Sequence, residues 1–141
     1  MPIDARELFR TLAVLGLPAE HYVVAGSAPL LVHGLRATIQ DVDVVARGPA
    51  WKAVLAQGTA HRAPFDGVRS VFLADGAVEV LDGWFPERLD WRIDRLIAEA
   101  EVIKGHRFLS LRRTLEWKAA LCRPKDAEDL RVLREVLCDT G

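Results

Sequence analysis

The chain has 141 residues and a formal net charge of −1, and 50% of its residues are hydrophobic while 28% are charged. This composition fits one ordinary globular domain over residues 1–141 and has too much apolar side chain for a disordered chain. The longest stretch without Asp, Glu, Lys or Arg covers residues 21–35, which is shorter than the roughly 20 residues that span a bilayer, so no membrane helix is expected.

The first third of the chain predicts a helix, a strand and a second helix. Leucines at helical spacing predict a helix over residues 8–15, which ends at Gly16. Residues 22–25 form a short β-prone run that stops at the Gly26-Ser27 pair. An apolar segment of helical character, residues 30–35, follows, with Ser27 as the expected N-cap. The predicted order is therefore strand, tight glycine turn, helix.

The middle of the chain predicts further strands and two helical stretches. Residues 41–45 alternate acidic residues with valine, which is typical of a strand, and a short helix is expected over residues 51–57. Two β-prone runs, residues 68–73 and 77–81, are separated by a turn sequence and predict a hairpin. Residues 86–100 are expected to be helical in part. The hairpin gives the sheet mixed strand directions.

The last third of the chain predicts a short extended segment and two helices. Residues 107–109 are β-prone, whereas residues 110–122 and 124–137 have helical periodicity on either side of a break at Pro124. Taken together, the elements predict an α/β fold of the α+β type. Its short mixed β-sheet is packed by helices, and a helix pair forms its C-terminal part.

The amino terminus and the cysteines indicate a cytoplasmic protein. Asp4, Arg6 and Glu7 stand before any apolar run, unlike the basic start and apolar centre of a secretory signal. Cys122 and Cys138 are too few for a disulfide framework and lack the paired spacing of a zinc site, so reduced structural thiols are expected. The charge balance is also far from that of a dedicated nucleic-acid binder.

Two aspartates stand out in the strand predicted over residues 41–45. Asp41 and Asp43 are two residues apart, so both side chains leave the same face with their backbones roughly 7 Å apart. Two carboxylates aimed together repel each other, and oxygen ligands of this kind favour Mg²⁺, Mn²⁺ or Ca²⁺. The alternative is a strand with one solvated face, in which Val42 and Val44 point inward and both aspartates meet water.

The Gly26-Ser27 turn upstream favours the first interpretation. A glycine turn that leads into a helix N-terminus presents free N–H groups and the positive end of a dipole to anions. The first aspartate of the acidic strand follows Ser27 by 14 residues. A phosphate site beside paired carboxylates suggests nucleotide chemistry with a divalent metal.

Three short segments in this order carry a resemblance to a known family: Gly26-Ser27, then His33-Gly34-Leu35-Arg36-Ala37-Thr38, then Asp41-Val42-Asp43. The combination resembles the polymerase-β-like minimal nucleotidyltransferases, nearest the AbiEii-type toxins. The resemblance implies that Gly26 and Ser27 contact a triphosphate and that Asp41 and Asp43 hold two catalytic Mg²⁺ ions, which Mn²⁺ can replace. Arg36 and Thr38 also fit the family's nucleotide-binding pattern, while His33 is expected to be a packed, hydrogen-bonded core histidine rather than a base.

The family usually adds a third carboxylate from a neighbouring strand. The run Val78-Glu79-Val80-Leu81-Asp82 offers two candidates on opposite faces. Glu79 lies inside the apolar run, whereas Asp82 stands beside Gly83, as turn residues commonly do. Glu79 is therefore expected to be the third catalytic and metal-binding carboxylate, although aspartate is the commoner residue at this place in the family.

Three charged residues lie on the apolar sides of the two C-terminal helices. Lys118 falls within the arc of Leu111, Leu115, Ala119, Leu121 and Cys122, and Asp126 and Asp129 share the apolar side of the last helix. Because buried charges are costly unless they are paired, Lys118 and the two aspartates are expected to meet or to line a cleft. Asp126 has a second explanation, since an acidic residue in a first turn complements the helix dipole. Relatives carry a similar Lys…Arg-x-Lys-Asp-x-x-Asp-Leu arrangement, which implies that Lys118 neutralises triphosphate charge.

The predicted activity is transfer of a nucleoside monophosphate from a nucleoside triphosphate to an acceptor hydroxyl, with release of pyrophosphate. The resemblance to toxins points to tRNA or a protein as the acceptor, while other small family members modify small molecules. A second subunit or a partner protein is expected to help hold the acceptor. The alternatives are a catalytically degenerate nucleotidyltransferase fold that acts as a binding module, and a structural α/β domain whose aspartates face open solvent far from Gly26.

Overall fold

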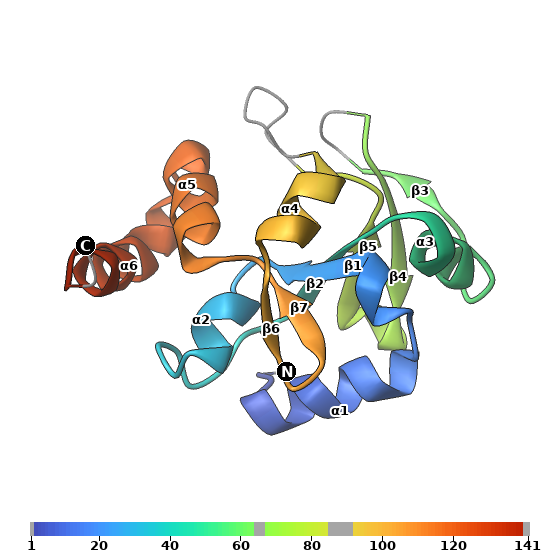
Figure 1. The fold of residues 1–141 in the computed structure, drawn as a ribbon, viewed down its shortest axis with the longest axis horizontal. Helices are drawn as coiled ribbons and strands as arrows, with labels where there is room; N and C mark the ends of the chain where they lie inside the picture. Colours follow the sequence, from blue (N-terminus) through green and yellow to red (C-terminus); the bar gives the residue numbers. More distant parts are fainter. Residues whose placement is uncertain (1, 64–66, 85–91, 140–141) are drawn as a thin grey trace.

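The computed structural model describes residues 2–63, 67–84 and 92–139, which form a mixed β-sheet packed by helices on both faces (Figure 1). The strand order in the sheet is β3-β4-β5-β2-β1-β7-β6. The strands are β1 (Tyr22–Ala25), β2 (Val42–Ala46), β3 (His61–Arg62), β4 (Arg69–Leu73), β5 (Val78–Leu81), β6 (Glu101–Ile103) and β7 (His106–Phe108). The helices are α1 (Ala5–Leu15), α2 (Ala28–Val32), α3 (Gly48–Leu55), α4 (Ile93–Glu99), α5 (Leu111–Leu121) and α6 (Ala127–Asp139), with 3₁₀ turns at Ala19–His21, Ala74–Gly76 and Pro124–Asp126.

The centre of the sheet combines both strand directions. Strand β2 pairs antiparallel with β1 and parallel with β5, while β7 runs parallel to β1 on its other side. The hairpin predicted over residues 68–73 and 77–81 is confirmed by the antiparallel pair β4 and β5. The expected mixed sheet is therefore present, and the α+β fold class is confirmed.

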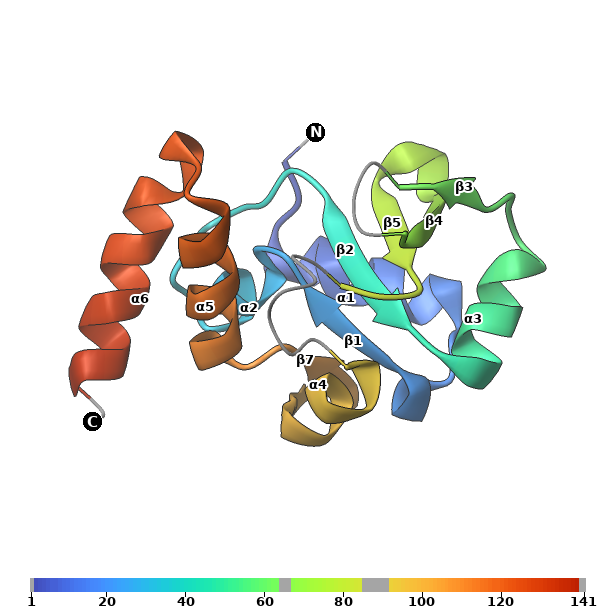
Figure 2. The same cartoon turned by 90° about the horizontal axis from the view of Figure 1, so that it is seen from above.

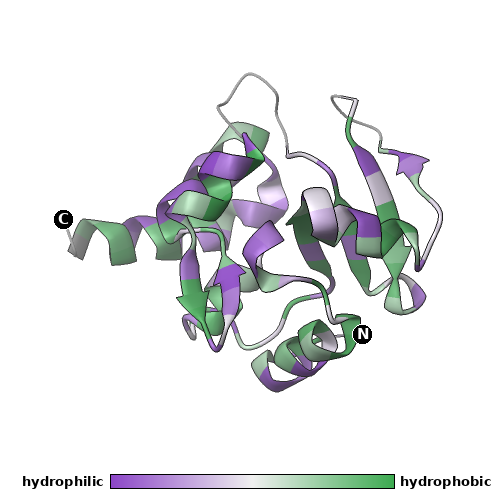
Figure 3. Ribbon diagram, turned by 45° about the vertical axis from the view of Figure 1, so that its right-hand side comes forward, coloured by the Kyte–Doolittle hydropathy of each residue, from purple (hydrophilic) through white to green (hydrophobic). Residues whose placement is uncertain are grey.

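Valine-rich central strands are buried on both faces and separate two apolar cores. On one face, Leu8 and Leu12 of α1 and Val54 of α3 belong to the same buried cluster as Val24 and Val44. The other face, with Val23, Val45 and Leu81, packs against Leu96 of α4 and Trp117 of α5. Figure 3 shows largely hydrophobic strands at the centre of the sheet and hydrophilic residues recurring along the helices.

The first helix begins and ends as its sequence predicts. Asp4 is the N-cap and accepts a hydrogen bond from the Glu7 N–H at 2.8 Å, and Gly16 closes the helix with a left-handed φ of 61°. Helix α2 is shorter than the predicted segment 30–35: it ends at Val32, and Gly34 then takes a positive φ of 72°. Among the described residues, no helix has both the length and the apolar character needed to cross a bilayer.

The two C-terminal helices stand together at one side of the sheet, with α5 against α2 and α6 outermost (Figure 2). Ser110 caps α5 by accepting from the Arg113 N–H at 3.1 Å, and Cys122 ends it with a φ of 54°. The buried residues of α5 are Thr114, Trp117 and Lys118 rather than the predicted leucine arc, and Cys122 is exposed. Lys118 is buried as its place in the predicted arc implies, whereas Leu111, Leu115, Ala119 and Leu121 are only partly buried.

One strand of a short hairpin was missing from the prediction. Residues 107–109 were expected to be extended, and they overlap β7, but its partner β6 was not predicted. Lys104 and Gly105, both with positive φ, form the tight turn between them. Helix α3 begins at Gly48, three residues before the predicted start. Part of the predicted 86–100 stretch is helical as α4, and residues 86–91 of it lie outside the described residues.

Candidate functional site

A cleft of about 350 Å³ opens where the sheet meets the C-terminal helices. Its walls come from distant parts of the sequence: the turn after β1, the start of β2, strand β5, helix α5 and the 3₁₀ turn before α6. The lining residues are Gly26, Ser27, Arg36, Ile39, Gln40, Asp41, Asp43, Glu79, Leu81, Trp84, Trp117, Lys118, Arg123, Lys125 and Asp126. Gly26, Ser27, Asp41 and Asp43 therefore share one concavity, as the sequence predicts.

The sheet contributes an acidic wall to this cleft. In the register of the strands, Ala25 of β1 lies opposite Asp43 of β2, and Asp43 lies beside Glu79 of β5, so both carboxylates leave the same face. Asp41 lines the cleft immediately before β2. Burial raises the pKa of Asp43 to about 7, and the charges of Asp41 and Glu79 add to the rise while Lys118 and Arg123 oppose it. The three carboxylates are thus close enough to repel one another.

Of the two candidates for the third carboxylate, Glu79 lines the cleft and Asp82 is not among its lining residues. The Glu79 side chain is hydrogen-bonded to the buried Ser70. Burial raises the pKa of Glu79, the Ser70 hydrogen bond opposes this, and the charge of Asp41 adds to it. Asp82 instead accepts hydrogen bonds from the backbone N–H and Nε of Arg69, both at 2.8 Å. Its carboxylate is therefore engaged in the β4–β5 hairpin.

Gly26 allows the acidic wall to approach the turn after β1. Its φ of +62° is one that L side chains rarely adopt, and a Cβ built there would lie 2.5 Å from Oδ2 of Asp43. A residue with a side chain would therefore be strained by its backbone and would collide with the carboxylate. This contact contradicts the arrangement that the structural-domain alternative predicts, in which the aspartates face solvent far from Gly26.

A buried ion network forms the opposite wall. Nζ of Lys118, which is only 1% exposed, donates to Oγ of Ser27 at 3.0 Å and to Oδ1 of Asp126 at 3.0 Å, and lies 3.2 Å from Oδ2 of Asp129. The predicted meeting of Lys118 with both aspartates is confirmed. An ammonium has three N–H donors, so these three partners satisfy Lys118. Ser27 holds the N-cap position of α2 but makes no side-chain cap bond, because its hydroxyl is used by Lys118.

Two arginines complete the network and keep part of their surface open. Nη1 of Arg36 donates to Oδ2 of Asp129 at 3.1 Å, and Nε of Arg123 donates to Oδ2 of Asp126 at 2.6 Å. Each arginine side chain is 34% exposed, and both line the cleft. The guanidinium of Arg123 also lies 5.2 Å from the ring centroid of Trp117. Together with the exposed Lys125, both arginines present positive charge to the cleft.

Two residues singled out from the sequence lie elsewhere. Thr38 lines a neighbouring depression beside Leu35, Lys125 and Glu128 rather than the main cleft, so its nucleotide-binding role stays a prediction. His33 is hydrogen-bonded as expected, through Nε2 to Oε2 of Glu101 at 2.7 Å, but it is exposed and not a core residue. It lies at the end of α2, where the chain leaves the sheet.

Several cleft residues were not selected from the sequence. Trp84 and Trp117 form an aromatic wall, with ring centroids 4.9 Å apart. Arg123 and Lys125 stand in the motif quoted above, but nothing in their spacing shows that they turn towards the cleft. The backbone reversal at Cys122 directs them there, and a left-handed C-cap at cysteine has no clear sequence signal because glycine is the usual residue.

The acidic wall fits a divalent cation in the chemistry of its donors, since hard ions prefer carboxylate oxygens. Within residues 2–63, 67–84 and 92–139, however, no group of three or more His, Cys, Asp or Glu side chains is arranged to hold a metal ion. Mg²⁺ usually binds through one or two carboxylates and takes its other ligands from water and substrate phosphates. The site therefore fits an ion that arrives with a phosphate ligand better than a permanently bound one.

Comparisons with known proteins support the fold. No protein-family model matches the chain, and no curated protein matches it. A crystal structure from Thermotoga maritima, of a protein named as a putative nucleotidyltransferase, superposes with a TM-score of 0.58 over 92% of this chain and 93% of that one. The two sequences are 19% identical. The chain thus has a nucleotidyltransferase-like fold, while the narrower resemblance to AbiEii-type toxins stays a prediction.

Proposed function

We propose that the protein is a metal-dependent nucleotidyltransferase, which moves a nucleoside monophosphate from a nucleoside triphosphate to an acceptor hydroxyl and releases pyrophosphate. The observation that carries this proposal is the division of one cleft into an acidic wall and a cationic wall that meet at Gly26-Ser27. The reaction needs both, because the phosphates are polyanions and the metal ions that neutralise them need carboxylate ligands.

The acidic wall would hold the metal. Asp41 and Asp43, with Glu79 beside them, are the residues that would bind Mg²⁺ or Mn²⁺, two ions in the complete site. When bound, the ions polarise the reacting phosphate and lower the pKa of the acceptor hydroxyl. The Ser70 hydrogen bond keeps Glu79 oriented, and Gly26 leaves room for the Asp43 carboxylate.

The cationic wall would receive the triphosphate. Arg36, Arg123 and Lys125 expose charge to the cleft, and guanidinium groups suit phosphate oxygens through paired N–H donors. Lys118 contributes its charge from beneath, while its three N–H groups hold Ser27 and the two aspartates. It therefore acts chiefly as a positioning residue, and direct phosphate contacts fall to the arginines and Lys125.

The test is a measurement of nucleotide binding and turnover in one experiment. Calorimetry with each of the four ribonucleoside triphosphates should show binding that requires Mg²⁺, and a pyrophosphate assay should show release. Asp43→Ala should lower pyrophosphate release by at least about a thousand-fold, because it removes a ligand of the proposed catalytic ions. Asp75→Ala, an exposed aspartate on the β4–β5 turn, is the matched control and should leave both readouts unchanged. Binding that is indifferent to Mg²⁺ and to Asp43 would contradict the proposal.

One observation favours a second candidate, a nucleotide-binding module without catalysis. The described residues contain no ready-made metal cluster, and the third carboxylate is the longer Glu79. This candidate predicts nucleotide binding through Arg36, Arg123 and Lys125 with no pyrophosphate release under any divalent cation. The same experiment therefore separates the two functions, since only the readout of release differs.

The acceptor and the biological setting belong to the proposal as well. The motif resemblance supports an acceptor hydroxyl on tRNA, on a protein or on a small molecule, and a toxin-like role that a partner protein controls. A toxic activity predicts that expression of the protein arrests bacterial growth and that Asp43→Ala removes the arrest. Normal growth with soluble, folded protein would exclude the toxin role without touching the proposed chemistry.

A further inference from the structure

Phe72 exposes an aromatic ring beside the acidic wall. Its side chain on β4 is 53% exposed, which is unusual for a large hydrophobic residue in a sheet whose central strands are buried. In the antiparallel register Phe72 lies directly opposite Glu79, which in turn lies beside Asp43. Directly opposed residues point to the same face, so the row Phe72, Glu79, Asp43 runs across one face of the sheet.

The two ends of this row differ in charge. Beyond Asp43, on the side of α5 and α6, stand Arg36, Arg123 and Lys125, which mark the place of the triphosphate tail. Nucleotidyl transfer proceeds in line: the acceptor oxygen forms its bond to the α-phosphorus opposite the bond to pyrophosphate that breaks. With the pyrophosphate directed towards the cations, the acceptor must approach from the opposite end of the row, where Phe72 lies.

We propose that Phe72 is the acceptor platform of the cleft and that the acceptor is a nucleoside unit, whose base stacks on this ring while its ribose hydroxyl reaches the α-phosphate. The inference rests on the proposed function and adds the acceptor class to it. In the step itself, the ribose oxygen binds the α-phosphorus, its proton passes to water, and the bond to pyrophosphate breaks as that group leaves.

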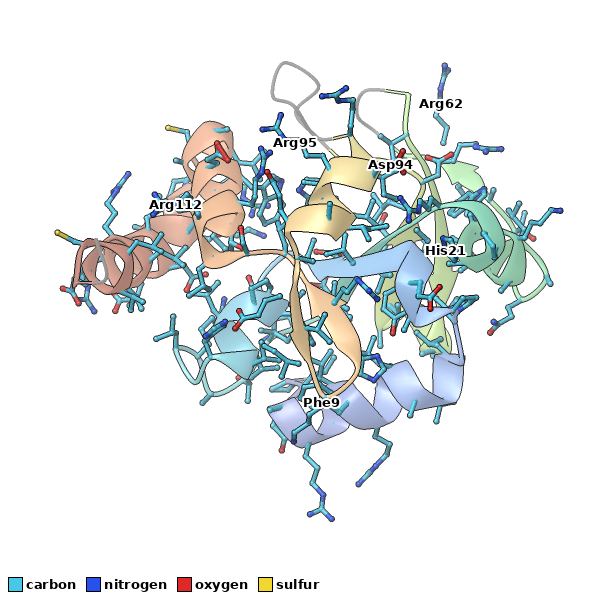
Figure 4. All side chains as sticks on the ribbon, in the orientation of Figure 1. Phe9, His21, Arg62, Asp94, Arg95 and Arg112 are labelled. Atoms are coloured by element: carbon cyan, nitrogen blue, oxygen red, sulfur yellow. The ribbon has the colours of Figure 1, made fainter. Side chains whose placement is uncertain are left out.

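The distances and the neighbours of Phe72 suit such an acceptor. Adjacent strands lie about 4.8 Å apart, so the backbone of Phe72 is about 10 Å from that of Asp43, a span that a base and its sugar can bridge. His61 lies on the same face one strand further out, opposite Ser70, and is exposed. Arg62, the next residue of β3, is also exposed but leaves the opposite face, and it extends from the edge of the sheet in Figure 4. An exposed aromatic ring is the usual stacking platform for an unpaired base.

The experiment offers different acceptors to the enzyme and its Phe72 variants. Triphosphates labelled on the α-phosphorus are incubated with Mg²⁺ and with a ribonucleoside mixture, glycerol or tyrosine amide. We expect label on the ribonucleosides and little on glycerol, which has hydroxyls and no ring. Phe72→Ala should lower this transfer roughly ten-fold or more, the effect of losing one stacked base, while Phe72→Trp retains it. Val102→Ala is the control, because Val102 is 57% exposed on β6 at the other edge of the sheet.

Binding of the triphosphate separates failure of this inference from failure of the proposed function. Phe72→Ala should bind Mg²⁺ and triphosphate as the parent does, because Phe72 lies outside the cationic wall. If the parent binds triphosphate but labels no ribonucleoside, labels glycerol or tyrosine amide in preference, or is unaffected by Phe72→Ala, the acceptor assignment is overturned. If the parent binds no triphosphate at all, the proposed function itself is overturned.

Discussion

The half-buried Asp43 and the buried Asp126, on opposite walls of the same cleft, have pKa values displaced in opposite directions. Burial first, and then the charges of Asp41 and Glu79, raise the pKa of Asp43 to about 7 against the opposing charges of Lys118 and Arg123. Burial also works to raise the pKa of Asp126, but hydrogen bonds and charges from Arg123 and Lys118 outweigh it, and the pKa of this carboxyl is lowered. The difference lies in the partners, because the helices supply cations and the sheet supplies more carboxylates.

This contrast indicates that the cationic wall is a structural network, whereas the acidic wall needs a ligand. On the helix wall, Lys118, Arg36 and Arg123 are matched with Asp126 and Asp129, so the charges are satisfied before any ligand arrives. On the sheet wall, Asp43 is ionised only at a cost, which a divalent cation would remove. Strongly displaced pKa values of the second kind are typical of functional sites, whereas those of the first kind also occur in structural networks.

Disrupting the buried ion network of the cationic wall should give the largest loss of stability. Lys118→Met leaves Asp126 and Asp129 buried without their shared ammonium, and removing one partner of a buried pair costs roughly 3–5 kcal/mol. Urea unfolding of the variant at pH 7 measures the loss. Arg131→Met serves as the control, because Arg131 pairs with Glu128 and Glu135 on the exposed face of α6, where ion pairs contribute little to stability. Equal losses in both variants would mean that the buried network does not stabilise the fold.

Removing a charge from the acidic wall should increase the stability of the protein rather than lower it. A raised pKa means that the folded protein holds the Asp43 proton more tightly than the unfolded chain, so this group lowers stability as the pH rises from about 4 to about 7. Asp43→Asn should therefore stabilise the metal-free protein by about 4 kcal/mol at pH 8, and the gain should vanish near pH 4. Urea unfolding at several pH values tests this, with Asp75→Asn as a control that shows no such dependence. A loss of stability at pH 8 would show that the Asp43 charge is compensated in the folded protein.

The elements of the acidic wall could be predicted because their signals are local. The alternation of Asp41 and Asp43 with valine fixes which side chains share a face, and Glu79 could be chosen over Asp82 from its place inside an apolar run. These residues and Gly26 line one cleft, as the sequence predicts, while the metal-binding role of Glu79 stays a prediction. Helical periodicity likewise placed Lys118 on the apolar side of its helix, which predicts that it is buried.

The parts that escaped prediction depend on long-range pairing or on unusual backbone. Strand β6 has only three residues and gains its partner through the tight turn at Lys104 and Gly105, so its own sequence carries little signal. The predicted arc of α5 placed Lys118 correctly but left out Trp117, because a periodicity alone cannot show which part of a helix meets the sheet. Trp117 faces the apolar core and the cleft, and this depends on how α5 docks.

The junction of the two walls can be tested through its glycine. Gly26→Ala adds strain at a positive φ and places a Cβ against Oδ2 of Asp43, so it should cost about 2 kcal/mol of stability. Gly34→Ala is matched in backbone, with a φ of +72°, but its Cβ would meet open space and should cost about 1 kcal/mol. Thermal unfolding measures the loss of stability in both variants, and the difference between the two losses gives the contribution of the contact with the Asp43 carboxylate. Identical costs would indicate that Asp43 can move away from the turn.

Stabilisation by magnesium is the smallest expected effect, and it tests directly whether the acidic wall binds a divalent cation. Magnesium that binds the folded protein alone should stabilise it at pH 8 by about 1.4 kcal/mol when present at ten times its dissociation constant. At pH 6 a carboxyl with a pKa of about 7 is mostly protonated. Because the proton competes with magnesium, the same magnesium concentration should then stabilise the protein by only about 0.4 kcal/mol. Asp43→Asn should abolish the stabilisation and Asp75→Asn should keep it. Equal stabilisation at both pH values, or stabilisation of Asp43→Asn, would show that magnesium binds elsewhere. No bound cation would then offset the repulsion between the carboxylates of the acidic wall.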